Sequence, residues 1–322
     1  MDFDHNNVRA SPNEDRLSDL PLELILQILT RVDTKIAIQI CLLLIPRWKL
    51  IWTSMPYLNF SSIEFKTLAK FSKFLTHVLS QRNHQVEVSS VNLCLHGEDT
   101  EDNFVREILK CAFSHNVQEL ILDIRLKNEF RPYFLRSKTL KHLTVRTFTC
   151  DLCVSPKTQW DLPALTTLYL DDISLCDDKL ESIDPFSKFV NLQNLTLEFV
   201  RVKAKVFEII APRLSNLKLI NFRSSNVIKV ISHQLENLTI IDCSIDDLNI
   251  PSGFSSLYYQ AYHPRKWLKD RFHSTNKVTV IFPIHCPIRP YRREDAHDII
   301  NVLQELHSAR FLTLNLDIVE VR

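Results

Sequence analysis

The chain has 322 residues, and its 39 lysines and arginines balance 38 acidic residues to a formal net charge of +1. This balance gives no reason to expect nucleic acid or an anionic membrane as a partner. Only two glycines occur, Gly97 and Gly253. Because phosphate-binding loops, dinucleotide folds and G-x-S-x-G nucleophile elbows need closely spaced glycines, the sequence contains none of these motifs.

Residues 1–14 are polar and are expected to be disordered. They lack the apolar core of a signal peptide, so we expect a cytoplasmic and/or nuclear protein with reduced thiols. Of the eight cysteines, Cys150 and Cys153 form a single C-x-x-C pair, whereas a structural zinc site usually has two pairs. We therefore expect no metal and no other cofactor. The longest apolar run, residues 36–45, is far shorter than the ~20 residues of a membrane-spanning helix, so no membrane segment is expected.

Residues 15–32 read DRLSDLPLELILQILTRV and predict an amphipathic helix. Pro21 suits the first helical position, where its missing N–H costs nothing, and Ser18 or Asp19 could cap the end. The apolar residues that follow recur at helical spacing: Leu24, Ile25, Ile28, Leu29 and Val32. A stripe of this width must be buried, either in the core of the protein itself or against another protein.

Three more helices are predicted by the same spacing. The second has an apolar stripe formed by Ala37, Ile40, Cys41 and Leu44, and it ends at Pro46. The third is short and contains Trp48, Ile51, Trp52 and Met55. Three helices in about forty residues bury little surface alone, so this unit needs a partner or a neighbouring domain. The fourth helix runs from Thr67 to Arg82, and its apolar side is formed by Phe71, Phe74, Leu75, Val78 and Leu79.

An L-x-x-L-x-L motif with variants then repeats along the chain, beginning with residues 88–93 and ending with residues 254–259. From Leu143 onward its central apolar residue recurs at 168, 195, 217, 238 and 257, in steps of 25, 27, 22, 21 and 19 residues. This is the period of leucine-rich repeats. Alternate side chains of each x-L-x-L-x segment point to opposite faces of a strand, so the leucines form a core and the x positions face outward. Further strands are predicted at 276–282 and 309–318, with a helix between them at 296–306.

The outward positions should form columns on the concave face of the stacked repeats. The central column contains Ile121, Thr144, Tyr169, Thr196, Lys218, Thr239 and Tyr258. A flanking column contains Glu119, His142, Thr167, Asn194, Asn216, Asn237 and Ser256. A rigid face of polar and aromatic side chains suits recognition of a protein or a small ligand. Individual members could equally be solvated strand residues.

Taken together, the N-terminal helices and the repeats resemble plant F-box/leucine-rich-repeat proteins of the F-box/FBD/LRR type. DRLSDLP at residues 15–21 resembles the F-box opening, and Ile28–Leu29 resembles its next apolar pair. TKIA at 34–37 and RWKLIW at 47–52 resemble its second half. FSKFLTHVLSQR at 71–82 is similar to the helix that joins F-box to repeats in this family, and residues 162–173 and 191–200 resemble its repeats.

Two features depart from the family pattern. LLLIPRW at 42–48 is one residue longer and more apolar than the usual run before the third helix, which could weaken docking. Many members of the family also carry a C-terminal FBD-type domain, and we expect none in this sequence.

The resemblance implies an α/β protein in which a three-helix F-box precedes a leucine-rich-repeat solenoid with a parallel sheet on its concave face. The implied segments are the F-box at 15–60, a linking helix at 61–85 and the repeats at 86–322. The F-box of such a protein docks on a Skp-type adaptor of an SCF-type cullin–RING ubiquitin ligase, and the repeats bind a protein substrate, here unknown. The expected adaptor-binding residues are Leu20, Pro21, Leu24, Ile25, Ile28, Leu29, Trp48 and Trp52. Spacing alone does not separate those that face the adaptor from those that face the helical core.

The central column supplies the expected substrate-facing residues, and the chain itself is expected to be non-catalytic. Two alternatives stay open at this point. The altered 42–48 run is compatible with a scaffold whose F-box is degenerate and whose repeats bind a partner for another purpose. An enzyme is the third possibility, although nothing clusters at catalytic spacing.

Overall fold

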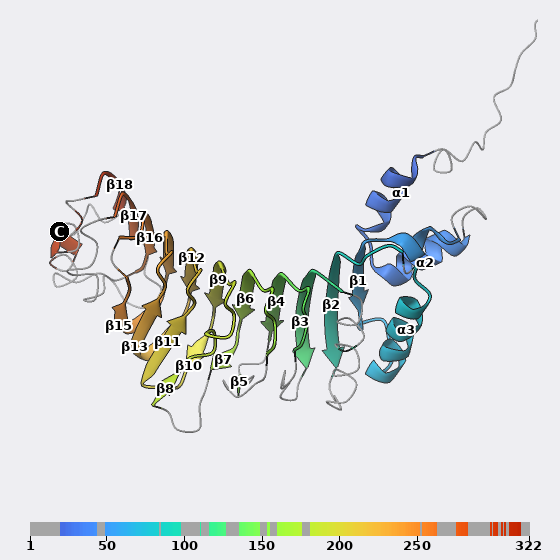
Figure 1. The fold of residues 1–322 in the computed structure, drawn as a ribbon, viewed down its shortest axis with the longest axis horizontal. Coiled ribbons are helices and arrows are strands. Elements are labelled where there is room, and N and C mark those ends of the chain that lie inside the picture. Colours follow the sequence, from blue (N-terminus) through green and yellow to red (C-terminus); the bar gives the residue numbers. More distant parts are fainter. Residues whose placement is uncertain are drawn as a thin grey trace, which may run out of the picture.

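In the part of the chain that the structure describes, eleven parallel strands form one sheet that runs along the molecule (Figure 1). The computed structural model describes residues 20–43, 49–83, 85–97, 110, 116–126, 135–148, 153–154, 160–175, 181–251, 253–262, 275–282, 297, 299–301, 304, 306 and 309–316. In order, the strands are β1 (Tyr57–Ser61), β2 (Ser90–Gly97), β3 (Glu119–Leu126), β4 (His142–Thr147), β6 (Thr167–Asp171), β9 (Asn194–Glu198), β12 (Asn216–Ile220), β14 (Asn237–Ile241), β16 (Ser256–Gln260), β17 (Lys277–Phe282) and β18 (Phe311–Leu316). The predicted solenoid with a parallel sheet is confirmed.

The repeat motif determines the register of this sheet. Leu195 lies opposite Leu217, and Leu197 lies opposite Leu219, with the same alignment along the row. These leucines are buried, whereas the residues between them face outward. Strand β1 is an addition that the repeat motif did not predict. It lies at the end of the segment 15–60 assigned to the F-box, and it pairs with β2. The large sheet therefore begins at Tyr57, before the predicted end of the F-box at residue 60, and that predicted boundary stays a prediction.

A second, smaller sheet backs part of the first and was not predicted (Figure 1). Its strands are β5 (Cys153–Val154), β7 (Ser174–Leu175), β8 (Ser182–Ile183), β10 (Arg201–Val202), β11 (Val206–Ile210), β13 (Arg223–Ile231) and β15 (Ser244–Asn249). Phe207 of β11 is fully buried, packing on Phe222 with ring centroids 5.6 Å apart and on Phe186 at 6.1 Å. Aromatic rings therefore fill the core beside these strands.

A sharp corner follows four consecutive strands of the large sheet. The residue after each strand has a positive φ: Asp172 (55°), Phe199 (50°), Asn221 (48°) and Asp242 (49°). The corner N–H continues the ladder, as where Phe199 donates to the Ile220 carbonyl at 2.9 Å. Aspartate and asparagine tolerate this left-handed conformation, whereas a bulky residue such as phenylalanine is strained in it.

We therefore expect Phe199→Asn to raise the free energy of unfolding by about 1 kcal/mol, because it removes the strain of a left-handed aromatic residue. The reverse exchange at the equivalent corner, Asn221→Phe, should lower it by a similar amount. Urea denaturation of both variants beside the wild type measures the two changes. An equal loss of stability in both would show that the Phe199 side chain contributes more by packing than its backbone costs.

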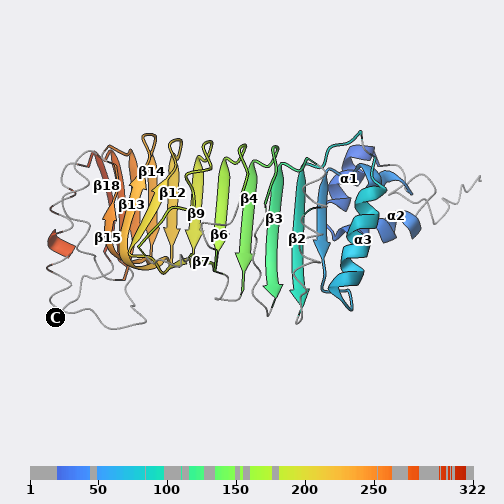
Figure 2. The ribbon, with the colours of Figure 1, turned by 60° about the horizontal axis from the view of Figure 1, so that its bottom comes forward.

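Helices gather at the β1 end of the large sheet (Figure 2). They are α1 (Leu22–Leu29), α2 (Thr34–Leu43), the short 3₁₀ helix η2 (Ile51–Ser54) and α3 (Leu68–Ser80). The predicted fourth helix is confirmed as α3, whose N-cap Thr67 accepts a hydrogen bond from the Lys70 N–H at 3.3 Å. Of the helix predicted at 296–306, residues 297, 299–301 and 304 are helical, and much of the rest lies outside the described residues.

The start of α1 differs from the prediction. Pro21 is the N-cap rather than the first helical residue, with φ −56° and ψ 148° and without a side-chain cap. Its carbonyl accepts from the N–H groups of Leu24 and Ile25, both at 3.1 Å, so the proline begins the helix through its carbonyl alone. Ser18 and Asp19, the expected caps, lie outside the described residues, as do Leu44, Pro46 and residues 1–14.

Candidate functional site

The apolar stripe of α1 divides between the inside and the outside of the protein. Ile25 and Leu29 are 2% and 1% exposed and belong to the core. Leu24 and Ile28, one residue earlier in each turn, are 45% and 51% exposed. The structure thus separates the residues of the stripe that face the helical core from those that face outward, which the sequence spacing could not do. Only packing against the neighbouring helices shows which half of a wide stripe is covered.

A groove of about 780 Å³ lies along the exposed half of this helix. We call it the α1 groove, and it is lined by Leu20, Leu24, Gln27, Ile28, Thr30, Arg31 and Tyr57. Tyr57 is the first residue of β1, so the groove lies between the first helix and the first strand of the solenoid. Pro21 is exposed beside it. Trp52 is half-buried against the core, and Trp48 lies outside the described residues.

Other large apolar side chains of the helical end are exposed too: Leu22, Ile36, Leu42, Leu43, Leu50 and Ile63. Single exposed leucines are ordinary on protein surfaces. Many of them on a small helical module, beside an apolar groove, are typical of a protein interaction surface.

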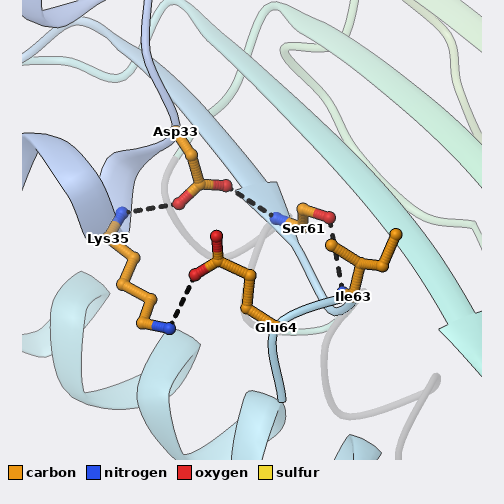
Figure 3. Close-up of polar contacts among 5 residues, drawn as sticks. All are labelled: Asp33, Lys35, Ser61, Ile63 and Glu64. Atoms are coloured by element: carbon orange, nitrogen blue, oxygen red, sulfur yellow. Dashed lines mark hydrogen bonds and ion pairs between the residues drawn. The ribbon is translucent and has the colours of Figure 1, made fainter.

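A polar clamp joins this helical module to the first strand (Figure 3). Asp33 accepts two backbone hydrogen bonds, from the Lys35 N–H at 2.8 Å and from the Ser61 N–H at 3.0 Å. Lys35 pairs with Glu64 at 2.7 Å and lies 4.8 Å from the Phe65 ring centroid. Burial raises the pKa of Asp33, and the two N–H donors oppose that shift. Because the clamp links α2 to β1, the α1 groove has a defined position relative to the sheet.

The predicted central column exists in the structure. Ile121 lies opposite Thr144, Thr144 opposite Tyr169, and Tyr169 opposite Thr196. The same register continues through Lys218, Thr239 and Tyr258. Lys218 is exposed and the other six are partly exposed, so the column lies on the outward face. Its role in binding stays a prediction.

Part of the flanking column is occupied by its own hydrogen bonds. The Asn216 amide donates to the Asn194 carbonyl oxygen at 2.7 Å, and the Asn237 amide donates to Asn216 at 2.7 Å. Asn194 in turn donates to Thr167 at 3.3 Å. These side chains form a ladder that joins neighbouring repeats, so a structural role accounts for them.

A third column, which the sequence analysis did not select, carries the charges of this face. It runs through Asp123, Arg146, Asp171, Glu198, Ile220, Ile241 and Gln260 in register. The signal that could have found it is the x position directly after each L-x-L. At β12 and β14 the charged residues of this column give way to Ile220 and Ile241, which Gln260 follows, so the charges of the column are confined to its first half.

Tyr169 connects the central and third columns. Its hydroxyl donates to the Glu198 carboxylate and approaches Asp171 at 3.5 Å, and the Arg146 guanidinium lies 5.3 Å from its ring centroid. Burial and the two carboxylates raise the pKa of Tyr169. Burial, and then the Glu198 charge, raise the pKa of Asp171. Keeping Asp171 ionised in the folded protein therefore costs free energy.

We expect Asp171→Asn to stabilise the protein at neutral pH. Because the pKa of Asp171 is raised, the folded state binds this proton more tightly than the unfolded state does. The contribution of Asp171 to the free energy of unfolding therefore falls as the pH rises from the ordinary pKa of 3.8 through the raised pKa. The advantage of the variant should therefore shrink toward pH 4. Urea denaturation across this range measures it, with the exposed Asp246→Asn as the control. A difference that does not change with pH would contradict this account of Asp171.

Neither a metal centre nor a membrane segment is found in the part of the chain that the structure describes. There, no group of three or more histidine, cysteine, aspartate or glutamate side chains could hold a metal ion. Cys150, one half of the C-x-x-C pair, lies outside that part. None of the described helices has the length and apolarity needed to cross a membrane.

Comparison with known proteins finds similar sequences in a plant. No family model matches the chain. It is 22% identical over 351 residues to an F-box/LRR-repeat protein of Arabidopsis thaliana, an alignment that covers 98% of this chain and 67% of the relative. Two F-box/FBD/LRR-repeat proteins of the same plant are 27% and 29% identical over 199 and 213 residues, covering 59% and 65% of this chain.

The alignments span only 43% and 48% of those two longer relatives. The homologues of this chain are thus Arabidopsis F-box/LRR-repeat and F-box/FBD/LRR-repeat proteins. This confirms the resemblance that the N-terminal motif and the repeats predicted.

Proposed function

We propose, from the premise that its homologues are F-box/LRR-repeat proteins, that the chain is a substrate-recognition subunit of an SCF-type cullin–RING ubiquitin ligase. Its helical module docks on a Skp-type adaptor, and its solenoid binds a protein substrate in the cytoplasm and/or nucleus. The observation that carries the proposal is the exposed half of α1. Leu24 and Ile28 line an apolar groove that nothing in the described part of the chain fills.

The docking energy comes from burying this apolar surface. Covering a leucine-sized side chain contributes roughly 1.5–3 kcal/mol, so two or three anchors are enough for a stable complex. In this proposal Leu20, Pro21, Leu24 and Ile28 contact the adaptor. Ile25 and Leu29 act indirectly, because they hold α1 on the helical core and so keep the exposed half in place.

The solenoid has a positioning role and performs no covalent chemistry. Binding a substrate on the concave face holds its lysines near the ubiquitin carrier that the ligase brings. The gain is one of effective concentration. The clamp of Asp33, Lys35 and Glu64 supports this role, since it keeps the adaptor side and the substrate side in one geometry.

The test is binding of the full chain to a purified plant Skp-type adaptor, by co-expression and isothermal titration calorimetry. We expect a stoichiometric complex with a dissociation constant near or below about 1 μM, which corresponds to a binding free energy of about −8 kcal/mol. No binding at micromolar concentrations would favour the alternative, a leucine-rich-repeat scaffold with a degenerate F-box. The altered 42–48 run is the feature that motivates this alternative. Proximity labelling with and without proteasome inhibition then identifies substrates, which accumulate when degradation stops.

A further inference from the structure

Two carboxylates lie opposite each other in the middle of the large sheet. Asp171 of β6 and Glu198 of β9 are register partners. Neighbouring strands are about 4.8 Å apart, and like charges directly opposite each other on such strands destabilise a sheet. We call these two residues the acidic pair. Folding alone does not favour this arrangement.

The groups around the acidic pair neutralise it only in part. The Tyr169 hydroxyl donates to Glu198 and lies 3.5 Å from the Asp171 carboxylate, so one proton serves two carboxylates. Burial raises the pKa of Asp171, and the charges of Glu198 and Asp172 raise it further. Arg146 opposes these effects, but among the described residues no lysine or arginine forms an ion pair with either member of the pair. This place therefore attracts a further cation.

The next two positions of the third column are apolar. Ile220 of β12 and Ile241 of β14 continue the register from Glu198. Both isoleucines are partly exposed on the outward face, where polar residues are usual when the other face of a sheet is buried. A partner that covers the acidic pair and these isoleucines must therefore carry both a positive charge and apolar groups.

The spacing of these positions matches that of an extended chain. Along the column, Ile220 lies about 7 Å and Ile241 about 12 Å from the midpoint of the acidic pair, at about 4.8 Å per strand. In an extended segment, residues i and i+2 are about 6.6 Å apart, and residues i and i+4 are about 13 Å apart. A segment that lies across the strands can therefore place residue i on the acidic pair and residues i+2 and i+4 on the isoleucines.

We propose that this part of the concave face binds an extended segment of the protein substrate that has an arginine at position i and apolar residues at i+2 and i+4. The arginine lies between Asp171 and Glu198. The apolar residues cover Ile220 and Ile241. The planar guanidinium carries its donors in a fork and can bond two carboxylates at once, which the compact lysine ammonium does less well. This proposal rests on the proposed function, because it names the class of substrate that the solenoid holds.

A metal ion is the other kind of cation that two carboxylates attract. Calcium and magnesium ions take six or more oxygen ligands. In the part of the chain that the structure describes, no group of three or more histidine, cysteine, aspartate or glutamate side chains could hold a metal ion. The neighbouring isoleucines would also have no role in binding a metal. These observations favour the side chain of a protein segment.

The test is binding of a fluorescein-labelled peptide to the full chain, measured by fluorescence anisotropy. The peptide has arginine, valine and valine at alternate positions, with threonine between them and glycines at both ends, and it is made in both orders. We expect one of the two orders to bind with a dissociation constant of about 100 μM or below. Citrulline in place of the arginine keeps the shape of the side chain and removes its charge. It should weaken binding at least roughly tenfold.

Variants of the chain separate the two parts of the surface. Asp171→Asn with Glu198→Gln should weaken binding of the arginine peptide at least roughly tenfold and leave the citrulline peptide unchanged. Ile220→Thr with Ile241→Thr should weaken both peptides, because both carry the valines. The matched control is Asp246→Asn, which removes an exposed carboxylate from β15 of the smaller sheet and should bind as the wild type does.

A second variant separates loss of binding from loss of folding. Asp171→Asn alone is expected to stabilise the protein at neutral pH, as argued above, and it should still weaken binding of the arginine peptide. Adaptor binding of all these variants should be unchanged, because β6 to β14 lie in the middle of the sheet and α1 lies at its end (Figure 1). A chain that binds the peptide and no adaptor would refute the proposed ligase function and leave this inference standing.

Three outcomes would overturn the inference. One is that neither order of the arginine peptide binds at concentrations up to about 1 mM. Another is that the variants of the acidic pair weaken the arginine and citrulline peptides equally. The third is calorimetric binding of calcium or magnesium ions that displaces the peptide and that Asp171→Asn with Glu198→Gln abolishes, since the pair would then be a metal site.

Discussion

Replacing Leu24 and Ile28 together by aspartate will weaken binding of a Skp-type adaptor by at least about a hundredfold, because two anchors of roughly 1.5–3 kcal/mol each are lost. Both side chains are about half exposed and line the α1 groove. Aspartate at these positions is therefore solvated in the free protein and should leave its folding intact. In the complex, the same carboxylates would be desolvated without a partner.

Calorimetric titration of the adaptor into each variant measures this loss, and two controls define its meaning. Val190→Asp makes the same kind of change at an exposed apolar position of the solenoid and should bind as the wild type does. Ile25→Asp changes the buried half of α1 and should reduce both the melting temperature and binding, because it places a charge in the core. Undiminished affinity of the Leu24/Ile28 double variant would refute the proposed docking surface.

Phe207→Ala will lower the free energy of unfolding by about 3–5 kcal/mol, the usual cost of removing a buried phenylalanine. Phe207 is fully buried, and its ring stacks on Phe222 and meets Phe186 edge to face. These contacts join three successive parts of the solenoid, so the surrounding residues cannot collapse into the cavity without moving both sheets. Little of the lost energy should be recovered by relaxation.

Urea denaturation measures the total loss, and hydrogen exchange shows where it occurs. The loss of protection should centre on β11 and its neighbours and spare α1, because each repeat contacts only its neighbours. Phe148→Ala is the control, since that ring is exposed and its main described contact is the Arg125 guanidinium 4.0 Å away. It should cost about 1 kcal/mol or less. A loss of similar size in both variants would contradict the account of the aromatic core.

The candidate site could be predicted only in part from the sequence. The central column was predicted because the x position of L-x-L must face away from the leucine core. The third column has the same spacing but mixes charges with isoleucines, so composition gave no reason to select it. The predicted flanking column contained Asn194, Asn216 and Asn237, but the sequence could not show that these side chains hydrogen-bond to one another.

By itself, the sequence determined the stack of parallel strands and the strand faces, because a motif that places leucines two residues apart in every repeat permits one register with a common core. It also determined that α1 is amphipathic. Only the tertiary structure decided that Ile25 and Leu29 are covered while Leu24 and Ile28 are open, because burial depends on neighbours distant in sequence. The same is true of the two sheet edges. Asp33 and Thr34 bond the outward N–H groups of β1, and among the described residues β18 is the last strand at the other edge. Both depend on where the chain places these segments and not on any local pattern.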